Sequence, residues 1–465
     1  MPLPKVVILS SLLLTDRTIL YNNFLPALSK HAEVYLWPTS ADLPPFNKLD
    51  IENVKVEKYP VVGEMKYSLT FLRRFNDYTW DSKRINRTRR LFFKYTRTKD
   101  ATWEAYASIY LGYVVNYLGL AALVERISRK YYLKENRSPE AYQRLADLKP
   151  DVLITTSPLL NTTEPGIVVA ATNLNIPVLA FISSWDNLST KSRFMFDFDG
   201  YILWSKQMEK DLNLFYPYAK KKPQYIVGAP QFDVFKNPDF YISKEDFCKQ
   251  YGLDPSKKIV LYTLGSPNLF NELPGAMEFV KRAAKGDMGD IQVLVRPHPV
   301  KHNDPGLADI TKLYNQAFIQ TGSNPKNDKD AHTHDKDKII EWVNTYKHVD
   351  IIIHTGSSTA IDGSFFDKGV INLEFDPSGE NEKLVWHVSH TVHHYKPMVD
   401  LGGMINVSNY DQMVAAVNKY IQDPGYLSEG RKKLLKFACE FSDGKSGERY
   451  AEAILDFIGK QQKAK

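Results

Sequence analysis

Short apolar runs without polar–apolar alternation recur along both halves of this chain and constrain its fold more than any other feature. Strands of this composition are buried on both faces, as in parallel sheets that carry helices above and below. Because helical patterns separate the runs, we predict an α/β protein with two Rossmann-like domains. The predicted strands are Val6–Leu14, Val34–Trp37, Asp151–Thr155, Pro177–Ile182, Tyr201–Trp204 and Tyr225–Val227 in the first half, and Lys258–Leu264, Ile291–Arg296, Val349–His354, Val370–Phe375 and Met404–Val407 in the second.

The chain length of 465 residues exceeds what one ordinary hydrophobic core holds and suits two domains. Proline and asparagine interrupt the pattern in Gly228–Ile242, so we place the domain junction there. The predicted domains are residues 1–235 and 236–440, and residues 441–465 are expected to form a helix that packs back on the first domain. The polar stretch Asn324–Lys338 is predicted to be a loop.

The composition is that of a globular protein, with 43% hydrophobic and 25% charged residues. Only two cysteines are present, Cys248 and Cys439, and they cannot form a disulfide framework. Their number fits a reducing compartment. The N-terminal residues run directly into a strand-like stretch and show neither the basic segment nor the cleavage site of a secretory signal. We therefore predict a cytoplasmic protein.

Basic residues cluster in residues 66–99, although the net charge of the chain is only +6. Only Asp77 and Asp81 oppose them, and aromatic residues lie among them. The cluster is either a solvated face or a surface that docks on an anionic membrane, and we predict peripheral contact with the inner face of the cytoplasmic membrane. RNA binding is less favoured because no RNA-binding motif accompanies it, so no nucleic-acid partner is predicted. The basic residues are Lys66, Arg73, Arg74, Lys83, Arg84, Arg87, Arg89, Arg90, Lys94, Arg97 and Lys99.

The uncharged stretch Ala105–Val124 is long enough to span a bilayer. Its tyrosine, asparagine, serine and glycine content is poor for a spanning segment. We therefore predict a buried or interfacial helix.

The stretch Val349–Phe375 has the pattern strand, loop, helix, strand. A serine hydroxyl is expected to cap the helix, which is predicted to run to about Lys368. A helix N-terminus just past a parallel strand is a ready anion site, and the hydroxyls suit a phosphate. Asp362 lies one turn after Ser358 and can accept from a ribose or sugar hydroxyl; a plain cap with a surface acid is the alternative. The predicted phosphate-binding residues are Gly356, Ser357, Ser358 and Thr359.

The stretch Arg296-Pro-His-Pro follows an apolar run and ends at Pro299. In open α/β sheets ligands bind at the carboxyl ends of strands. The flanking prolines fix the backbone around His298. A cationic Arg296 and a histidine able to donate suit the charge that develops on a departing phosphate. The alternative is a structural turn.

The stretch Ser183-Ser-Trp-Asp-Asn-Leu-Ser-Thr-Lys also follows a predicted strand, in the first half of the chain. Asp186 can take a proton from an acceptor hydroxyl. An aspartate with an ordinary pKa is a weak base near neutral pH, so this role requires desolvation or direct contact. The alternative is an Asx-turn that caps the next helix.

No metal site is predicted. Asp197-Phe-Asp199 has the DxD form of some metal-dependent transferases, but it precedes a predicted strand instead of following one. The histidine-rich stretch His387–His394 lacks the glutamate of the HExxH zinc motif and is expected to be a loop lining a cleft. The acidic stretch Asp328–Asp337 lacks the glycine and the spacing of a calcium loop.

Taken together, these motifs resemble the CDP-glycerol glycerophosphotransferase and capsule-polysaccharide transferase superfamily, which has the GT-B glycosyltransferase fold. The resemblance covers roughly Pro177 to Ile454 and rests on the order and spacing of short motifs. These are Val227–Asp233, Leu261–Thr263, Arg296–Pro299, Ser357 and Ser358 with Asp362, Asp367–Gly369 before Val370–Phe375, and Asp443-Gly444 with Arg449.

The resemblance implies two Rossmann-like domains that face a central cleft. It also implies that His298, Ser357 and Ser358 contact the nucleotide diphosphate or the departing phosphate. The Trp-His-Gly-Thr motif of the family, whose histidine is the expected base, falls where this chain has Trp185-Asp-Asn-Leu. Asp186 replaces that histidine, which favours sugar transfer over glycerophosphate transfer. The first 150 residues match no motif of the family, so the acceptor stays open.

The sequence therefore predicts a metal-independent glycosyltransferase that needs no cofactor. It would move a sugar from a nucleotide-sugar donor to a surface-polysaccharide or lipid-linked acceptor, with Asp186 and His298 as catalytic residues. Three alternatives stay open. They are a nucleotide-sugar 2-epimerase, a CDP-glycerol-type glycerophosphotransferase and a non-catalytic nucleotide-binding scaffold.

Overall fold

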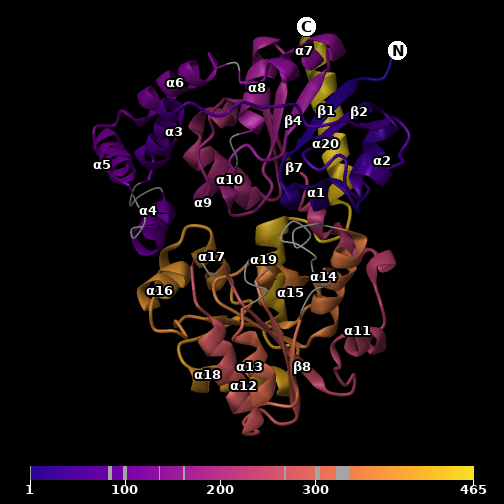
Figure 1. The fold of residues 1–465 in the computed structure, drawn as a ribbon, viewed down its shortest axis with the longest axis vertical. Helices are drawn as coiled ribbons and strands as arrows, with labels where there is room; N and C mark the ends of the chain where they lie inside the picture. Colours follow the sequence, from indigo (N-terminus) through magenta and orange to yellow (C-terminus); the bar gives the residue numbers. More distant parts are fainter. Residues whose placement is uncertain are drawn as a thin grey trace. The chain divides into compact units, whose positions relative to one another are not determined.

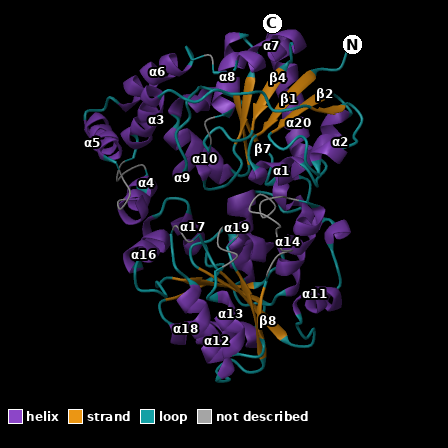
Figure 2. Cartoon of the chain, in the orientation of Figure 1, coloured by secondary structure: helices purple, strands orange, loops and turns teal. Residues whose placement is uncertain are grey.

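A computed structural model describes residues 2–81, 86–97, 102–135, 137–160, 163–266, 269–298, 304–320 and 335–464 (Figures 1 and 2). The chain divides into two compact units, each built on one parallel sheet. Unit 1 comprises Met1–Arg90, Lys99–Lys236 and Ala438–Lys465. Unit 2 comprises Leu91–Thr98 and Asn237–Phe437.

The sheet of unit 1 has the strand order β3-β2-β1-β4-β5-β6-β7, and every neighbouring pair is parallel. The order reverses between β1 and β4, which makes their carboxyl ends the topological switch point where doubly wound sheets bind ligands. The near-continuous apolar runs explain the burial of the central strands on both faces. The strands are β1 (Lys5–Ser10), β2 (Glu33–Pro38), β3 (Val54–Val56), β4 (Val152–Thr155), β5 (Val178–Phe181), β6 (Gly200–Leu203) and β7 (Gln224–Ile226).

The helices of unit 1 include the C-terminal helix α20, which returns to this unit and packs against α2. The ring of Tyr450 stacks on Phe24 at 4.1 Å and on Phe181 at 4.7 Å between ring centroids. The helices are α1 (Leu13–Ile19), α2 (Phe24–Ser29), α3 (Tyr67–Thr79), α4 (Thr88–Phe92, which ends in unit 2), α5 (Trp103–Tyr117), α6 (Ala121–Tyr132), α7 (Pro139–Leu148), α8 (Glu164–Asn173), α9 (Asn187–Thr190), α10 (Lys206–Phe215) and α20 (Ser446–Ala464).

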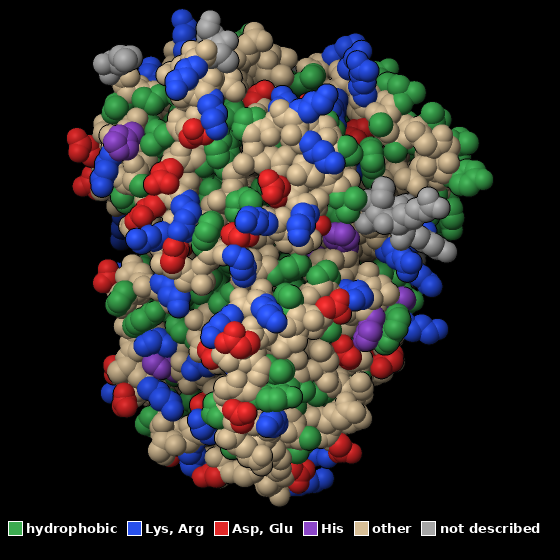
Figure 3. All heavy atoms as spheres, turned by 180° about the vertical axis from the view of Figure 1, so that it is seen from behind, with side chains coloured by type: hydrophobic (Ala, Val, Ile, Leu, Met, Phe, Trp, Pro, Cys, Tyr) green, Lys and Arg blue, Asp and Glu red, His purple; other side chains and the backbone are tan. Residues whose placement is uncertain are grey.

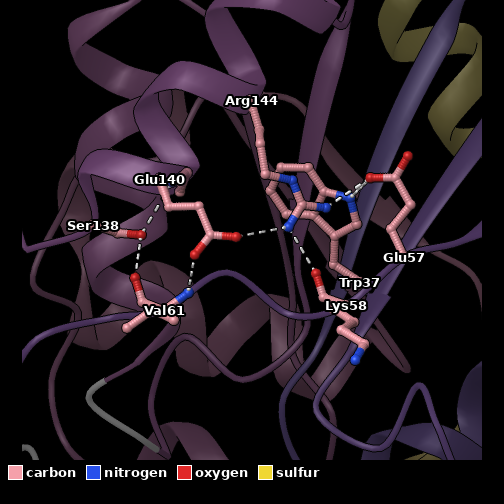
Figure 4. Close-up of polar contacts among 8 residues, drawn as sticks. Trp37, Glu57, Lys58, Val61, Ser138, Glu140 and Arg144 are labelled. Carbon is pink, nitrogen blue, oxygen red and sulfur yellow. Dashed lines mark hydrogen bonds and ion pairs between the residues drawn. The ribbon is translucent and has the colours of Figure 1, made fainter.

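A polar network ties the segment after β3 to helix α7 (Figure 4). The guanidinium of Arg144 lies 4.1 Å from the ring of Trp37, and its Nη2 donates to Glu57 Oε2 at 2.6 Å. The indole Nε1 of Trp37 donates to the same oxygen at 3.0 Å. At the start of α7, Ser138 Oγ donates to the carbonyl of Val61 at 2.7 Å. These contacts fix the point where the chain leaves the sheet for helices α3 to α6.

The sheet of unit 2 has the order β10-β9-β8-β11-β12-β13 and is also parallel throughout, with its switch point between β8 and β11. The strands are β8 (Lys258–Thr263), β9 (Ile291–Arg296), β10 (Ala317–Ile319), β11 (Ile351–His354), β12 (Gly369–Leu373) and β13 (Ile405–Val407). The helices are α11 (Lys244–Tyr251), α12 (Leu273–Ala284), α13 (Leu307–Leu313), α14 (Lys336–His348), α15 (Thr359–Phe365), α16 (Glu382–Thr391), α17 (Tyr395–Asp400), α18 (Tyr410–Gln422) and α19 (Ser428–Cys439, which ends in unit 1).

The predicted α/β class with two Rossmann-like units is confirmed. The predicted strand Val6–Leu14 is wrong in its second half, because β1 ends at Ser10 and α1 begins at Leu13. A short apolar run looks alike in a buried strand and at the start of a buried helix. Strands β3 and β10 were not predicted from the sequence. Each has three residues and lies at an edge of its sheet.

The structure bears on three further predictions. Ala105–Val124 was expected to form one helix, but it is divided between α5 and α6 by a turn in which Gly119 has a φ of 72°. Among the described helices, none is long and apolar enough to cross a bilayer. The loop predicted for His387–His394 is wrong for its first residues, which lie in α16, where Trp386 and His390 stack one turn apart. Both cysteines, Cys248 and Cys439, are buried.

Candidate functional site

The residues of unit 2 that are predicted to bind the nucleotide-sugar donor lie at the carboxyl ends of its strands. Arg296 ends β9 and is followed by His298, while His354 ends β11 and is followed by Gly356. Strand β8 lies between them, and Leu264 just after it donates its N–H to the carbonyl of Arg296 at 2.9 Å. Parallel strands bring these ends together at the switch point. Pro299 of the same motif is outside the described residues, as is most of the predicted loop 324–338.

Helix α15 begins at Thr359 with Ser358 in the N-cap position. The side chain of Ser358 makes no capping hydrogen bond, and Ser357 Oγ accepts from the N–H of Thr359 at 3.3 Å. The N-cap residue Ser358 therefore does not cap α15 with its hydroxyl, and the predicted serine cap is limited to the contact from Ser357. The helix ends at Phe365 and not near Lys368, because Asp367 takes a left-handed φ of 53°.

Gly356 turns the chain from β11 toward α15 with a φ of 54°. A Cβ at this position would lie 2.5 Å from Val388 Cγ1, so only glycine fits. The N–H of Gly356 donates to Asn372 Oδ1 at 3.1 Å, and the hydroxyl of Tyr395 donates to the same oxygen at 3.1 Å. The loop is thus held in one conformation by a buried amide on β12.

His354 is a site residue that the sequence analysis missed. It is fully buried, and burial lowers the pKa of its imidazole to about 3, so the ring is neutral. Its Nδ1 accepts from the N–H of Ser357 at 3.2 Å. The backbone N–H groups of Gly356, Ser357 and Thr359 therefore all have acceptors within the protein. A phosphate at this loop would depend on hydroxyl groups and on Arg296 more than on these amides.

Arg296 and Asp362, predicted separately, interact electrostatically. Asp362 is buried, and its Oδ1 accepts from the indole Nε1 of Trp342 at 2.8 Å. Burial works against the charge of Arg296, but the neighbouring Tyr346, Glu341 and Asp362 more than offset this and raise its pKa. The Nη1 of Arg296 is inaccessible to solvent and has no hydrogen-bond partner among the described residues. That donor needs an acceptor.

Glu272, directly before α12, was also missed because it belongs to no motif. It is buried, and burial raises the pKa of its carboxyl to about 7. Its Oε2 accepts from the N–H of Gly265, just past the end of β8. A carboxyl with this pKa exchanges a proton near neutral pH at the switch point of unit 2.

Asp186 lies past the carboxyl end of β5 in unit 1, as predicted. It occupies the N-cap position of α9, but its side chain makes no capping bond to the backbone. Instead, its Oδ1 accepts from Ser184 Oγ at 2.6 Å and its Oδ2 from Thr190 Oγ1 at 3.0 Å. The Asx-turn alternative is therefore not what the geometry shows. Two hydroxyls hold the carboxylate in one rotamer.

Two acids at the switch point of unit 1 escaped the sequence analysis. Ser10 Oγ donates to Asp16 Oδ1 at 2.5 Å, and Ser11 Oγ donates to Glu164 Oε1 at 2.5 Å. Both carboxyl groups are buried. Burial raises the pKa of Asp16 to about 7 and also raises that of Glu164. Serines at the end of an apolar run were the only sequence sign of this cluster.

The discounted DxD stretch has a structural role. Asp199 lies before β6, and its Oδ2 accepts from the N–H of Val178 at 3.0 Å, joining the amino ends of β5 and β6. In the described parts of the chain, no three histidine, cysteine, aspartate or glutamate side chains are grouped so that they could hold a metal ion.

Known structures resemble the whole chain, whereas no protein-family model and no curated protein sequence matches it. A UDP-N-acetylglucosamine 2-epimerase aligns with a TM-score of 0.54 and 13% identity, covering 98% of this chain and 96% of that one. The UDP-GlcNAc 2-epimerase from Neisseria meningitidis, bound to UDP-GlcNAc, gives 0.53 and 12%, covering 97% and 100%. A glycosyltransferase from Rickettsia africae gives 0.51 and 11%, covering 98% and 99%.

The chain has the GT-B fold. The likeness extends over both units and over nearly the full length of each compared structure. At these identities it concerns the fold alone.

Proposed function

We propose that the chain is a glycosyltransferase that moves a sugar from a nucleotide-sugar donor to a surface-polysaccharide or lipid-linked acceptor without a metal ion. Unit 2 would hold the nucleotide diphosphate of the donor. Asp186 of unit 1 would accept the proton of the acceptor hydroxyl. The donor residues of the proposal are Arg296, His298, Gly356, Ser357, Ser358 and Thr359.

The observation that carries the proposal is the buried Nη1 of Arg296, which has no partner within the described residues. Asp362 and Glu341 favour the charged form of Arg296. Arg296 ends β9, and sheets of this kind bind ligands at the carboxyl ends of their strands. A phosphate oxygen that reaches the guanidinium would form a charge-assisted pair with it, although Nη1 itself is closed to solvent in this structure. The UDP-GlcNAc bound to the Neisseria meningitidis epimerase supports a nucleotide sugar as the ligand class.

The reaction balances with these groups alone. The acceptor oxygen forms a bond to the anomeric carbon while the bond from that carbon to the phosphate oxygen breaks. The acceptor proton passes to the carboxylate of Asp186, and the electron pair leaves on the nucleoside diphosphate. Arg296 and His298 would stabilise that developing charge, which is the largest electrostatic demand of the step.

The proposal includes membership in the CDP-glycerol glycerophosphotransferase and capsule-polysaccharide transferase superfamily. It also includes a cytoplasmic location, with peripheral contact at the inner face of the membrane through residues 66–99. The first point rests on the sequence motifs, and the other two rest on the cysteine count, the N-terminal residues and the basic cluster.

The test is turnover of a panel of nucleotide sugars, with CDP-glycerol included, in the presence and absence of polysaccharide and lipid-linked acceptors. Released nucleotide and modified acceptor would be measured together. Asp186→Asn should reduce transfer by about 10²–10⁴-fold while nucleotide binding stays unchanged. The exposed Asp50→Asn in the same unit is the matched control. Equal transfer by Asp186→Asn and the wild type would remove Asp186 from the mechanism.

A nucleotide-sugar 2-epimerase is the second candidate. Asp16 and Glu164, with raised pKa values at the switch point of unit 1, are a pair of acids such as proton abstraction and return require. An epimerase turns over without an acceptor, and in D2O it places deuterium on the sugar carbon that it inverts. Deuterium incorporation that is lost in Asp16→Asn or Glu164→Gln would favour this candidate. Nucleotide binding without any turnover would favour the scaffold.

A further inference from the structure

Helices α5 and α6 carry an exposed face of large apolar and aromatic side chains. Tyr117 is 90% exposed and Trp103 is 75% exposed, and exposed apolar side chains that gather on one face mark a protein or membrane interaction surface. We call this surface the α5–α6 face. Its main members are Trp103, Tyr110, Val114, Tyr117, Leu123 and Tyr131.

The face is organised by helical periodicity. Tyr110, Val114 and Tyr117 recur at spacings of four and three residues, which places them on one side of α5. The opposite side of α5 packs on α3, where Gly112 lies so close to Tyr78 that a Cβ would be 2.8 Å from Tyr78 Cβ. Figure 3 shows hydrophobic side chains gathered over α5 and α6 at the upper right. The apolar side is therefore turned outward by the way α5 is packed.

The exposed charges on and just after α6 have one sign, whereas α5 carries the half-buried acid Glu104 beside Trp103. Arg126, Lys130 and Lys134 are exposed on or just after α6. The acid Glu125 on the same helix is buried and paired with Arg193 at 3.2 Å and with Arg129 at 3.1 Å. The exposed ionic groups of α6 are thus basic, beside aromatic side chains that suit the boundary between water and lipid.

Several basic residues of the cluster 66–99 make contacts within the protein. Arg89 pairs with Asp77 at 3.0 Å. Arg90 lies 3.9 Å from the ring of Tyr113, on α5. Arg73 is partly buried and donates to the carbonyl of Leu159 at 3.4 Å. Much of the predicted membrane surface is therefore structural. Lys83, Arg84 and Lys99 are outside the described residues.

We propose that the α5–α6 face docks on an anionic lipid bilayer, with both helices lying in the plane of the interface. The apolar side would enter the boundary between headgroups and acyl chains, and Arg126, Lys130 and Lys134 would contact anionic headgroups. This inference rests on the proposed function in one respect only: a lipid-linked acceptor would lie in the bilayer on which the face docks. It names a different surface from residues 66–99.

The experiment is flotation of the purified full chain with vesicles, without any nucleotide sugar. Vesicles of phosphatidylcholine alone are compared with vesicles that also contain phosphatidylglycerol. We expect binding to the anionic vesicles that weakens as salt rises. Val114→Ser with Tyr117→Ser should abolish it. Arg126→Gln with Lys130→Gln should weaken it about fivefold per residue.

Two matched controls lie elsewhere on unit 1. Leu43→Ser removes an apolar side chain that is 52% exposed, and Lys220→Gln with Lys221→Gln removes two exposed charges. Both controls should bind as the wild type does, and thermal unfolding should show that all variants are folded. Three results would overturn the proposal. They are failure of the wild type to bind anionic vesicles at low salt, equally strong binding of the wild type to neutral vesicles, and binding by the face variants that is as strong as that of the wild type. So would a dimer in light scattering that the face variants disrupt, because the face would then cover a second copy. None of these results depends on transferase activity.

Discussion

The indole Nε1 of Trp342 donates to Asp362 Oδ1 at 2.8 Å and so fixes a buried carboxylate of α15 against α14. The same carboxylate helps to sustain the charge of Arg296 at the end of β9. The sequence predicted that Asp362 would accept from a ribose or sugar hydroxyl. That contact stays a prediction. What the structure adds is a hydrogen bond from Trp342 to Asp362 and an electrostatic effect of Asp362 on Arg296, the last residue of β9.

Trp342→Phe should destabilise unit 2. The change removes the indole N–H that donates to a buried carboxylate, and the loss of such a hydrogen bond costs about 1–3 kcal/mol. Chemical denaturation of the full chain would measure the loss. The control is Trp386→Phe, the same change at a side chain that is 49% exposed in the same unit. Equal effects of the two substitutions would show that the hydrogen bond to Asp362 contributes nothing specific.

Arg144→Lys should destabilise unit 1 although it keeps the charge. The ammonium group cannot reproduce the planar stack on Trp37 together with the hydrogen bond to Glu57. We expect a loss of about 1–3 kcal/mol in the free energy of unfolding. Arg126→Lys, at an exposed position on α6, should change it by less than about 0.5 kcal/mol. A small effect at Arg144 would mean that the network of Figure 4 is dispensable.

Asp16→Asn should flatten the dependence of stability on pH. Burial raises the pKa of Asp16 from 3.8 to about 7, so between these values the folded chain holds a proton that the unfolded chain releases. The contribution of the protonated acid is fully present below the lower value and is lost as pH rises through the upper one. The wild type should lose up to about 1.4 kcal/mol per pH unit from this group.

The measurement is denaturant unfolding at several pH values across that window. A residual slope in Asp16→Asn is expected from Glu272, whose pKa is also raised to about 7, and from Glu164, whose pKa is also raised by burial. The exposed Asp50→Asn should keep the full slope of the wild type. An unchanged slope in Asp16→Asn would show that this carboxyl is ionised in the folded chain across the whole window.

Gly356→Ala separates backbone strain from crowding. The positive φ alone should cost about 1–2 kcal/mol, and the clash with Val388 should add about 1–3 kcal/mol. Gly379→Ala is the matched control, because Gly379 has a φ of 71° but no neighbour within 4 Å of an added Cβ. Thermal unfolding should rank Gly356→Ala well below Gly379→Ala. Equal values would mean that the loop after β11 can shift at no cost.

The sequence was sufficient for the sheets and for the location of Arg296, His298, Gly356 and Asp186, because long apolar runs mark buried parallel strands and their carboxyl ends follow directly. It was insufficient for β3 and β10, two of the four three-residue strands. It also missed Asp16, His354 and Glu272. Their chemistry comes from burial by residues distant in sequence, and no local pattern encodes that. The sequence did not predict the α5–α6 face for the same reason, because packing decides which side of an apolar helix stays exposed.

The central claim is a nucleotide diphosphate site at the carboxyl ends of β9 and β11, and isothermal titration with UDP, CDP, GDP and dTDP tests it most directly. We predict that at least one of them binds the wild type and binds His298→Ala and Ser358→Ala at least about tenfold more weakly, a loss of about 1.4 kcal/mol. The exposed His31→Ala and Ser408→Ala are the matched controls and should bind normally. Absence of binding by every nucleotide, or equal binding by all variants, would contradict the account.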